Sequence, residues 1–220
     1  MEKKALIIGA TGFVGENALK TLLQSNIYKE VIALVRTPLE YQHKKLKEVI
    51  INFDHLDEYQ SLFAVDDIYC CLGTTIKKAK TQENMKKIDV DYPVKCAKLG
   101  KKMGAKQFIV ISAIGANSNS AFFYSRIKGM LEENLAALSF DALLILQPSL
   151  LLGERDEFRF GEKISSIIFP LLHPLLVGPL KKYKGIHAEK VAAAMYKIAQ
   201  MNKKGVLIIP SDKIAELAEG

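Results

Sequence analysis

Tryptophan is absent from this sequence and cysteine is scarce, with three cysteines among 220 residues. Cys70 and Cys71 are adjacent inside an apolar run, Cys96 stands apart, and no Cys/His spacing resembles a zinc site. So few cysteines, odd in number, argue against a disulfide-stabilised secreted domain. We expect three buried, reduced thiols and no metal.

Targeting and membrane-spanning segments of the usual kind are also missing. The opening residues, MEKKALIIGATG, contain no apolar stretch of about 7–15 residues such as a signal peptide has. The most apolar segment, Ile164 to Leu180, is interrupted by three prolines and a histidine, which makes it too broken and too short to span a bilayer. These absences predict a soluble protein of the cytoplasm.

Charge of one sign is not concentrated in any part of the chain. The 31 basic residues outnumber the 24 acidic residues and give a net charge of +7. The lysines are scattered in short groups such as KKLK, KKAK and KKYK, and no recognisable nucleic-acid-binding module accompanies them. The pattern favours a solvated, lysine-rich surface over a nucleic-acid partner.

Apolar, β-rich runs alternate with helical patterns, which is typical of a parallel sheet covered on both faces. Strands are predicted at Ala5–Ile8, Val31–Val35, Val49–Phe53, Ile68–Leu72, Gln107–Ser112, Ala142–Gln147 and Val206–Ile209. Helices are predicted at Val14–Gln24, Leu56–Leu62, Gln82–Met103 (broken at Pro93), Phe123–Leu138 and Ala188–Met201. The sequence therefore predicts a single α/β domain over residues 1–220, a doubly wound parallel sheet of the Rossmann type.

The stretch ALIIGATGFVGENALKTLL places three glycines between an apolar strand and a helix. Glycine lets the backbone turn tightly and approach a pyrophosphate, while the helix N-terminus supplies N–H donors and the positive end of the helix dipole. The alternative is a purely structural turn. In this context we expect a dinucleotide-binding turn formed by Gly9, Thr11, Gly12, Phe13, Val14 and Gly15.

The end of the second predicted strand indicates which dinucleotide is bound. A carboxylate about twenty residues after the glycines would bond the ribose of NAD, whereas an arginine suits the 2′-phosphate of NADP. The sequence has Arg36 there, followed by Thr37 as a further donor, and no carboxylate before Glu40. We expect NADP(H) as the preferred cofactor, with NAD(H) possible. The alternative for Arg36 is a solvent-exposed strand end.

Two further strand ends belong to the same edge, because ligands of open α/β sheets lie along the carboxyl ends of the strands. Asp54 follows the third strand and is a candidate contact for the adenine amino group, with helix capping as its alternative role. Leu72, Gly73 and Thr74 follow the fourth strand, where glycine again lets the backbone approach a ligand. We expect all four residues in the cofactor site.

Tyr124 and Lys128 are four residues apart, which places them on one face of a helix. A nearby ammonium group stabilises a phenolate and lowers the pKa of the tyrosine towards the range useful for proton transfer. Ser112, at the end of the fifth strand, is a candidate hydrogen-bond donor to a substrate carbonyl oxygen. These three residues form the predicted catalytic group. A chance surface pair is the alternative for the tyrosine and lysine.

With these motifs the chain resembles the short-chain dehydrogenase/reductase superfamily and, more narrowly, an atypical NAD(P)H-binding branch similar to the Tat-interacting oxidoreductase-like family. The resemblance spans nearly the whole chain and is carried by GATGFVG, ALVR, CCLGTT, KIDVDYPVKCAKLGKKMGAKQFIVIS, YSRIKGMLEENL and LQPSLLLGER. It implies that Tyr124 is the general acid, and that Lys128 tunes it and binds the nicotinamide ribose. It also implies that the nicotinamide end is lined by Pro148, Ser149 and Leu150.

One departure from the family pattern concerns the serine. Many relatives have a second serine directly after the first, where this chain has Ala113. If Ser112 points away from the substrate, Ser118 or Ser120 would be a substitute.

A second departure concerns an asparagine that catalytic relatives often have on the fourth helix, where KIDVDY offers Asp89 and Asp91 instead. The leading hypothesis is an NADP(H)-dependent oxidoreductase acting on a small carbonyl-like substrate. The alternative is an NADPH-binding regulatory or scaffold protein with little or no turnover, acting through a protein partner.

The segment 148–186 follows the sixth predicted strand and is rich in leucine and isoleucine. In a fold of this kind it would form a small apolar lid over the nicotinamide and the substrate pocket, or else complete the core. The remaining chain is short for the substrate domain of a nucleotide-sugar enzyme. We expect a small-molecule substrate, and an oligomer is possible through helices 82–103 and 123–138.

Overall fold

Seven apolar runs pair side by side into one parallel sheet in the computed structural model, which describes residues 2–152 and 178–220. The strand order is β3-β2-β1-β4-β5-β6-β9, and every neighbouring pair is parallel. The strands are β1 (Lys3–Ile8), β2 (Tyr28–Val35), β3 (Leu46–Ile50), β4 (Asp67–Cys70), β5 (Gln107–Ile111), β6 (Ala142–Gln147) and β9 (Gly205–Pro210).

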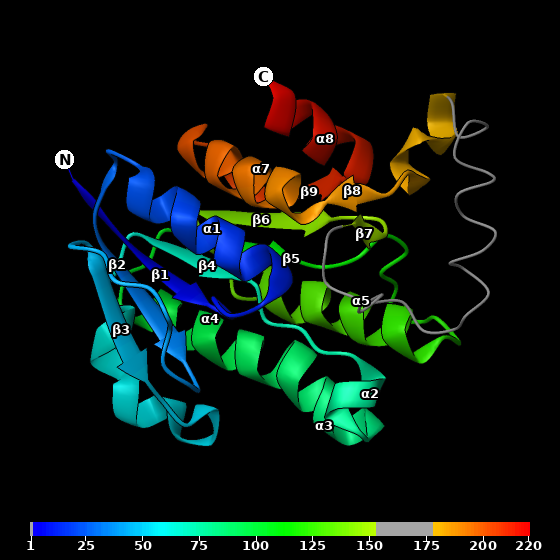
Figure 1. Ribbon diagram of the computed structural model, residues 1–220. Coiled ribbons are helices and arrows are strands. Elements are labelled where there is room, and N and C mark those ends of the chain that lie inside the picture. Colours follow the sequence, from blue (N-terminus) through cyan, green and yellow to red (C-terminus); the bar gives the residue numbers. More distant parts are fainter. Residues whose placement is uncertain (1, 153–177) are drawn as a thin grey trace.

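Helices cover both faces of this sheet (Figure 1). One face packs against α1 (Phe13–Gln24), α7 (Ala188–Gln200) and α8 (Ser211–Glu219). The other packs against a 3₁₀ segment (Phe53–Phe63), α3 (Gln82–Lys86), α4 (Tyr92–Lys102) and α5 (Phe123–Ala136). Because successive strand residues point to opposite faces, both of which are covered, the central strands are apolar over most of their length, with polar residues such as Asp67 and Gln107 at their starts.

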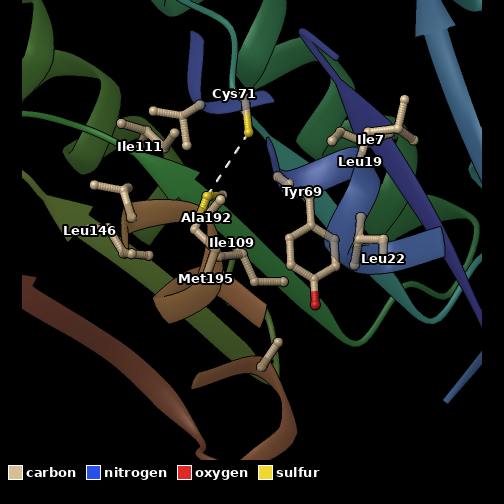
Figure 2. Packing of buried hydrophobic residues seen from close by; sticks show 14 of the residues in the cluster. Ile7, Leu19, Leu22, Tyr69, Cys71, Ile109, Ile111, Leu146, Ala192 and Met195 are labelled. Atoms are coloured by element: carbon tan, nitrogen blue, oxygen red, sulfur yellow. Dashed lines mark hydrogen bonds between the residues drawn. The ribbon is translucent and has the colours of Figure 1, made fainter. Parts of the chain in front are cut away.

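The core on the α1 and α7 side reaches the edge of the sheet at which the strands end (Figure 2). Tyr69 and Ile109 from the sheet belong to this cluster together with Leu19 and Leu22 of α1. Cys71, just beyond β4, donates its S–H to the sulfur of Met195 on α7 at 3.9 Å. This packing fixes the position of the residues that follow β4.

The strand order reverses direction at β1, which pairs with β2 on one side and with β4 on the other. In doubly wound sheets the ligand site lies outside the carboxyl ends of the strands at such a reversal. The predicted Rossmann-type fold is therefore confirmed, and the residues after β1 and β4 lie at its switch point.

The structure differs from the prediction most clearly at the third strand, at the helix predicted over residues 82–103 and at the C-terminus. The third strand is Leu46–Ile50 rather than Val49–Phe53, because Asn52 accepts a hydrogen bond from the N–H of Asp54 and begins the 3₁₀ segment. The helix predicted at 82–103 is α3, a π turn (Lys87–Asp91) and α4, with Pro93 in the first turn of α4, so the predicted break occurs there. Helix α8 was not predicted.

The predicted lid, residues 148–186, is described only at its two ends, since residues 153–177 lie outside the described part of the chain. Strand β7 (Leu151–Leu152) pairs in parallel with β8 (Ile186–His187), and a 3₁₀ segment (Gly178–Tyr183) precedes β8. The two ends of the segment therefore meet beside the sheet. That the intervening residues act as a lid stays a prediction.

All three cysteines are free and buried, which confirms the expectation for the thiols. Burial raises the pKa of Cys70 to about 12 and also raises the pKa of Cys96. Because the thiolate is the reactive form, the native protein should not react with an aromatic disulfide reagent over minutes, whereas the unfolded chain should release three equivalents. Rapid reaction of even one thiol in the folded protein would contradict this burial.

Candidate functional site

A tight turn between β1 and α1 forms one wall of the candidate site. Gly9 has φ +83°, the N–H of Gly12 donates to the carbonyl oxygen of Gly9 at 3.0 Å, and Gly12 is the N-cap of α1. No side chain caps this helix. Backbone N–H groups at its positive end therefore suit an anionic group.

Close backbone contacts explain two of the three glycines. A Cβ on Gly9 would lie 2.7 Å from the carbonyl carbon of Cys71, and a Cβ on Gly15 would lie 2.0 Å from the carbonyl oxygen of Gly9. Gly15 therefore lets α1 pack against the turn. Neither Gly15 nor Val14, which is buried in the core, is among the residues that line the cleft described next.

An open cleft of about 270 Å³ runs along the ends of β1, β2 and β4. Its wall at β1 is the tight turn, whose backbone a side chain at Gly9 would displace. A cradle of this kind fits the pyrophosphate of a dinucleotide. The cleft brings together many of the predicted cofactor residues, namely Gly9, Thr11, Gly12, Phe13, Arg36, Leu72, Gly73 and Thr74.

Two cations lie at the β2 end of the cleft. Arg36 is exposed just beyond β2, and Lys78 comes from α2 (Ile76–Ala79). Both residues line the cleft and a neighbouring groove, so they lie where the two hollows meet. Lys78 was missed in the sequence, although it lies only three residues after the CCLGTT segment. Thr37 is exposed and does not line the cleft.

Asp54 is not among the residues that line the cleft, and its predicted contact with adenine stays a prediction. Its Oδ1 accepts a hydrogen bond from the Tyr92 hydroxyl at 2.6 Å and pairs with Lys87 Nζ at 2.6 Å. These two partners lower the pKa of Asp54. The difference arises because the chain enters the 3₁₀ segment at Phe53, which turns Phe53 into the cleft and Asp54 towards α4.

A second, smaller pocket of about 20 Å³ joins the predicted catalytic residues. Tyr124 and Lys128 on α5 line it with Ser112, which follows β5. It shares Cys71, Leu72, Gly73 and Thr74 with the cleft, so the two hollows are neighbours along the residues after β4. Pro148 and Ser149 also line this pocket, as does Leu151 in place of the predicted Leu150.

Lys128 is held by a buried carboxylate that the sequence analysis noted only as a departure. Its Nζ lies 5.8 Å from the ring centroid of Tyr124 and 2.9 Å from Oδ2 of Asp89. The other oxygen, Asp89 Oδ1, accepts the N–H of Thr74 at 2.7 Å. Asp89 therefore ties α5 to the loop after β4. The distance in sequence between Asp89 and the Tyr124–Lys128 pair does not predict the contact between Asp89 and Lys128.

Ser112 points towards α5. Its hydroxyl donates to Oε1 of Glu132, and Nε2 of Gln147 donates to the same carboxylate at 2.9 and 3.1 Å. Burial raises the pKa of Glu132. While Glu132 is ionised, the Ser112 proton is therefore engaged away from a substrate. This is the orientation for which the sequence analysis named substitutes.

Neither substitute serine is directed into the small pocket by its contacts. The Ser118 hydroxyl donates to Oε1 of Glu133, and the oxygen of Ser120 accepts the N–H of Phe122 at 3.2 Å. Within the described chain, neither residue is among those lining the pocket. The loop is nevertheless tightly packed on α5, because a Cβ on Gly129 would lie 2.0 Å from the N–H nitrogen of Ser118.

The fold and the glycine-lined cleft define a dinucleotide-binding α/β protein. A family model described as NAD(P)H-binding matches residues 9–148, so the chain belongs to this NAD(P)H-binding family. Two curated relatives extend the match. Protein HTATIP2 of Rattus norvegicus is 36% identical over 171 residues, covering 76% of this chain and 70% of the relative. Protein FMP52, mitochondrial, of Eremothecium gossypii is 32% identical over 219 residues, which cover 98% of this chain and 97% of the relative. The resemblance found in the sequence is confirmed.

The expected cytoplasmic location is contradicted by this comparison. The FMP52 proteins of Eremothecium gossypii and Candida albicans, 32% and 33% identical over nearly the full length of both chains, are named mitochondrial. Three free, buried cysteines do not distinguish the cytoplasm from a mitochondrial compartment. In residues 2–152 and 178–220, no helix is long and apolar enough to cross a bilayer.

Solved structures with the same fold are distant in sequence. MoeE5 in complex with UDP-glucose and NAD superposes with a TM-score of 0.69 at 15% identity, covering 98% of this chain and 81% of that one. The Bordetella bronchiseptica enzyme WbmH in complex with NAD+ superposes with a TM-score of 0.70 at 15% identity, covering 100% and 80%. These similarities concern the fold. Across the described residues, no group of three or more metal-ligating side chains forms a cluster.

Proposed function

We propose that the protein is an NADP(H)-dependent oxidoreductase that reduces a small carbonyl-like substrate, with Tyr124 as the proton donor. The observation that carries the proposal is the small pocket formed by Tyr124, Lys128 and Ser112, which borders the nucleotide cleft along Leu72 to Thr74. A carbonyl group held there has a phenol on one side and the cofactor cleft on the other.

The residues divide the work between binding and proton transfer. The turn from Gly9 to Gly12 and the N-terminus of α1 hold the pyrophosphate. A bound nicotinamide supplies the hydride that the carbonyl carbon receives. Tyr124 donates its phenolic proton to the carbonyl oxygen, which completes the alcohol, and the ammonium of Lys128 offsets the negative charge left on the phenolate.

The activity is tested by following NADPH oxidation against a panel of aldehydes, ketones and quinones. At least one acceptor should give saturable oxidation, and the corresponding alcohol should appear in equal amount. A protein that binds NADPH yet oxidises it with no member of such a panel would contradict the proposed reaction.

Arg36 carries the preference for NADP(H) over NAD(H). Charge-assisted hydrogen bonds contribute about 1.5–3 kcal/mol, so Arg36→Ala should weaken NADPH binding about tenfold or more while NADH binding stays unchanged. Lys29→Ala is the matched control, because it removes an exposed positive charge at the opposite end of β2. Equal losses for NADPH and NADH in Arg36→Ala would contradict recognition of the 2′-phosphate.

A second candidate function is supported by the Ser112–Glu132 hydrogen bond. Because the Ser112 proton is donated to Glu132, the small pocket lacks the serine donor predicted for a substrate carbonyl. This favours an NADPH-binding regulatory protein that acts through a partner. Capture of a partner that depends on NADPH, with no acceptor-dependent oxidation, would support it. Acceptor-dependent oxidation would exclude it.

A further inference from the structure

The Lys128–Asp89 ion pair is almost fully enclosed. The exposed fractions of the two side chains are 4% and 1%, and their charged atoms are 2.9 Å apart. Asp89 belongs to the π turn between α3 and α4, and the N–H of Thr74 fixes its second oxygen. π turns within helices frequently mark functional positions. Here the turn brings a carboxylate to the lysine beneath the small pocket.

The carboxylate of Asp89 therefore compensates the positive charge of Lys128 and reduces its effect on Tyr124. A lone ammonium group within about 4–6 Å of an acid lowers the pKa of that acid by about 1–3 pH units. An ammonium paired with a carboxylate has no net charge, and at the phenol the two charges partly cancel. Both members of the pair line the same small pocket as Tyr124.

We infer that Asp89 is a positioning residue that keeps the Tyr124 phenol protonated by offsetting the charge of Lys128, an inference that rests on the proposed role of Tyr124 as proton donor. A reductase needs the phenol in its protonated form when the substrate arrives. Asp89 widens the pH range in which that form is present. It also holds the ammonium beneath the pocket through Thr74, so that the charge still stabilises the phenolate after proton transfer.

The charged and titratable residues that line the small pocket with Tyr124 are Lys128, Asp89 and Cys71. Arg126 and Glu132 lie on the same helix as Tyr124, and Cys70 ends β4 directly before Cys71. Cys70 is an uncharged thiol over the relevant range, with a pKa of about 12. Glu132 is engaged with Ser112 and Gln147, and Arg126 with the carbonyl oxygen of Ser120.

The test is an NMR pH titration of the protein with isotope-labelled tyrosine, in which the Tyr124 signal is assigned by its loss in Tyr124→Phe. In Asp89→Asn the amide oxygen can still accept the N–H of Thr74, but the charge is removed. The pKa of Tyr124 should then be about one pH unit lower than in the wild type. A pKa equal to or above the wild-type value overturns the inference.

Asp91→Asn is the matched control, since Asp91 belongs to the same π turn but pairs with Lys86 at the surface. It should leave the Tyr124 pKa unchanged, and an equal decrease there would overturn the inference.

Asp89→Asn leaves a buried ammonium unpaired, which can prevent folding. The double variant Asp89→Asn/Lys128→Gln avoids this, because it removes both buried charges together. Its Tyr124 pKa should lie close to the wild-type value, and a pKa about one pH unit higher than in the wild type, which would mean that the ammonium was not offset, overturns the inference.

The titration uses no substrate, so its outcome is independent of turnover. A lower pKa in Asp89→Asn without any carbonyl reduction in the wild type would support the inference and contradict the proposed reaction. Carbonyl reduction with an unchanged pKa in Asp89→Asn would do the reverse.

Discussion

Gly9→Ala should weaken NADPH binding about a hundredfold or more, which corresponds to about 2.8 kcal/mol of binding free energy. Two effects combine at this position. The backbone has φ +83°, a left-handed conformation that costs a residue with a Cβ about 1–2 kcal/mol. The new Cβ would also lie 2.7 Å from the backbone of Cys71 and 2.8 Å from the nitrogen of Leu72. Backbone atoms cannot rotate away, so the turn and the residues after β4 must separate.

Gly104→Ala separates these two effects. Gly104 has φ +90°, yet a Cβ there would meet nothing within 4 Å. It should therefore lose about 1 kcal/mol of folding stability from the conformation alone and bind NADPH like the wild type. Calorimetric titration of both variants, after circular dichroism has shown them folded, makes the comparison. Wild-type affinity in Gly9→Ala would contradict the placement of the pyrophosphate at this turn.

Tyr124→Phe should reduce turnover by about 10²–10⁴, the usual contribution of a general acid, while NADPH affinity changes little. Phenylalanine keeps the ring that packs above Lys128 and removes only the hydroxyl. Tyr41→Phe is the control, because Tyr41 is exposed between β2 and β3 and its ring stacks on His43. Rates of NADPH oxidation with the best acceptor are compared for the three proteins. Equal rates in Tyr124→Phe and wild type would contradict the assignment of Tyr124 as proton donor.

The sheet could be predicted from the sequence because its signals are local. The strand ALII and the glycines after it define the β1–α1 turn, and the apolar runs of β5 and β6 are continuous because both sheet faces are covered. At the edge of the sheet the sequence signal is weak. No residue of β3 is buried and its burial does not alternate, so its position depends on pairing with β2 and not on its own composition. Helix α8 was missed because its burial depends on contacts with α7 and β9.

The residues of the candidate site could be predicted where their position at the end of a strand places them. They could not be predicted where their role depends on a partner from another segment of the chain. Gly9, Arg36 and Thr74 each follow a strand, and strand ends share one edge of the sheet. Asp89 and Glu132 act through partners 39 and 20 positions away in the chain, Lys128 and Ser112. No spacing rule connects residues on a π turn, a strand end and a helix face. Asp54 lies within the 3₁₀ segment rather than directly after β3, and its hydrogen bond to Tyr92 on α4 could not be predicted from its position in the sequence.

The most direct test of the account is a titration of the purified wild-type protein with NADPH and with NADH, followed by nucleotide fluorescence. We predict saturable binding of NADPH that is about tenfold or more tighter than binding of NADH, because Arg36 lies at the end of the cleft. If neither nucleotide binds, the cleft is not a dinucleotide site and the proposed function is wrong.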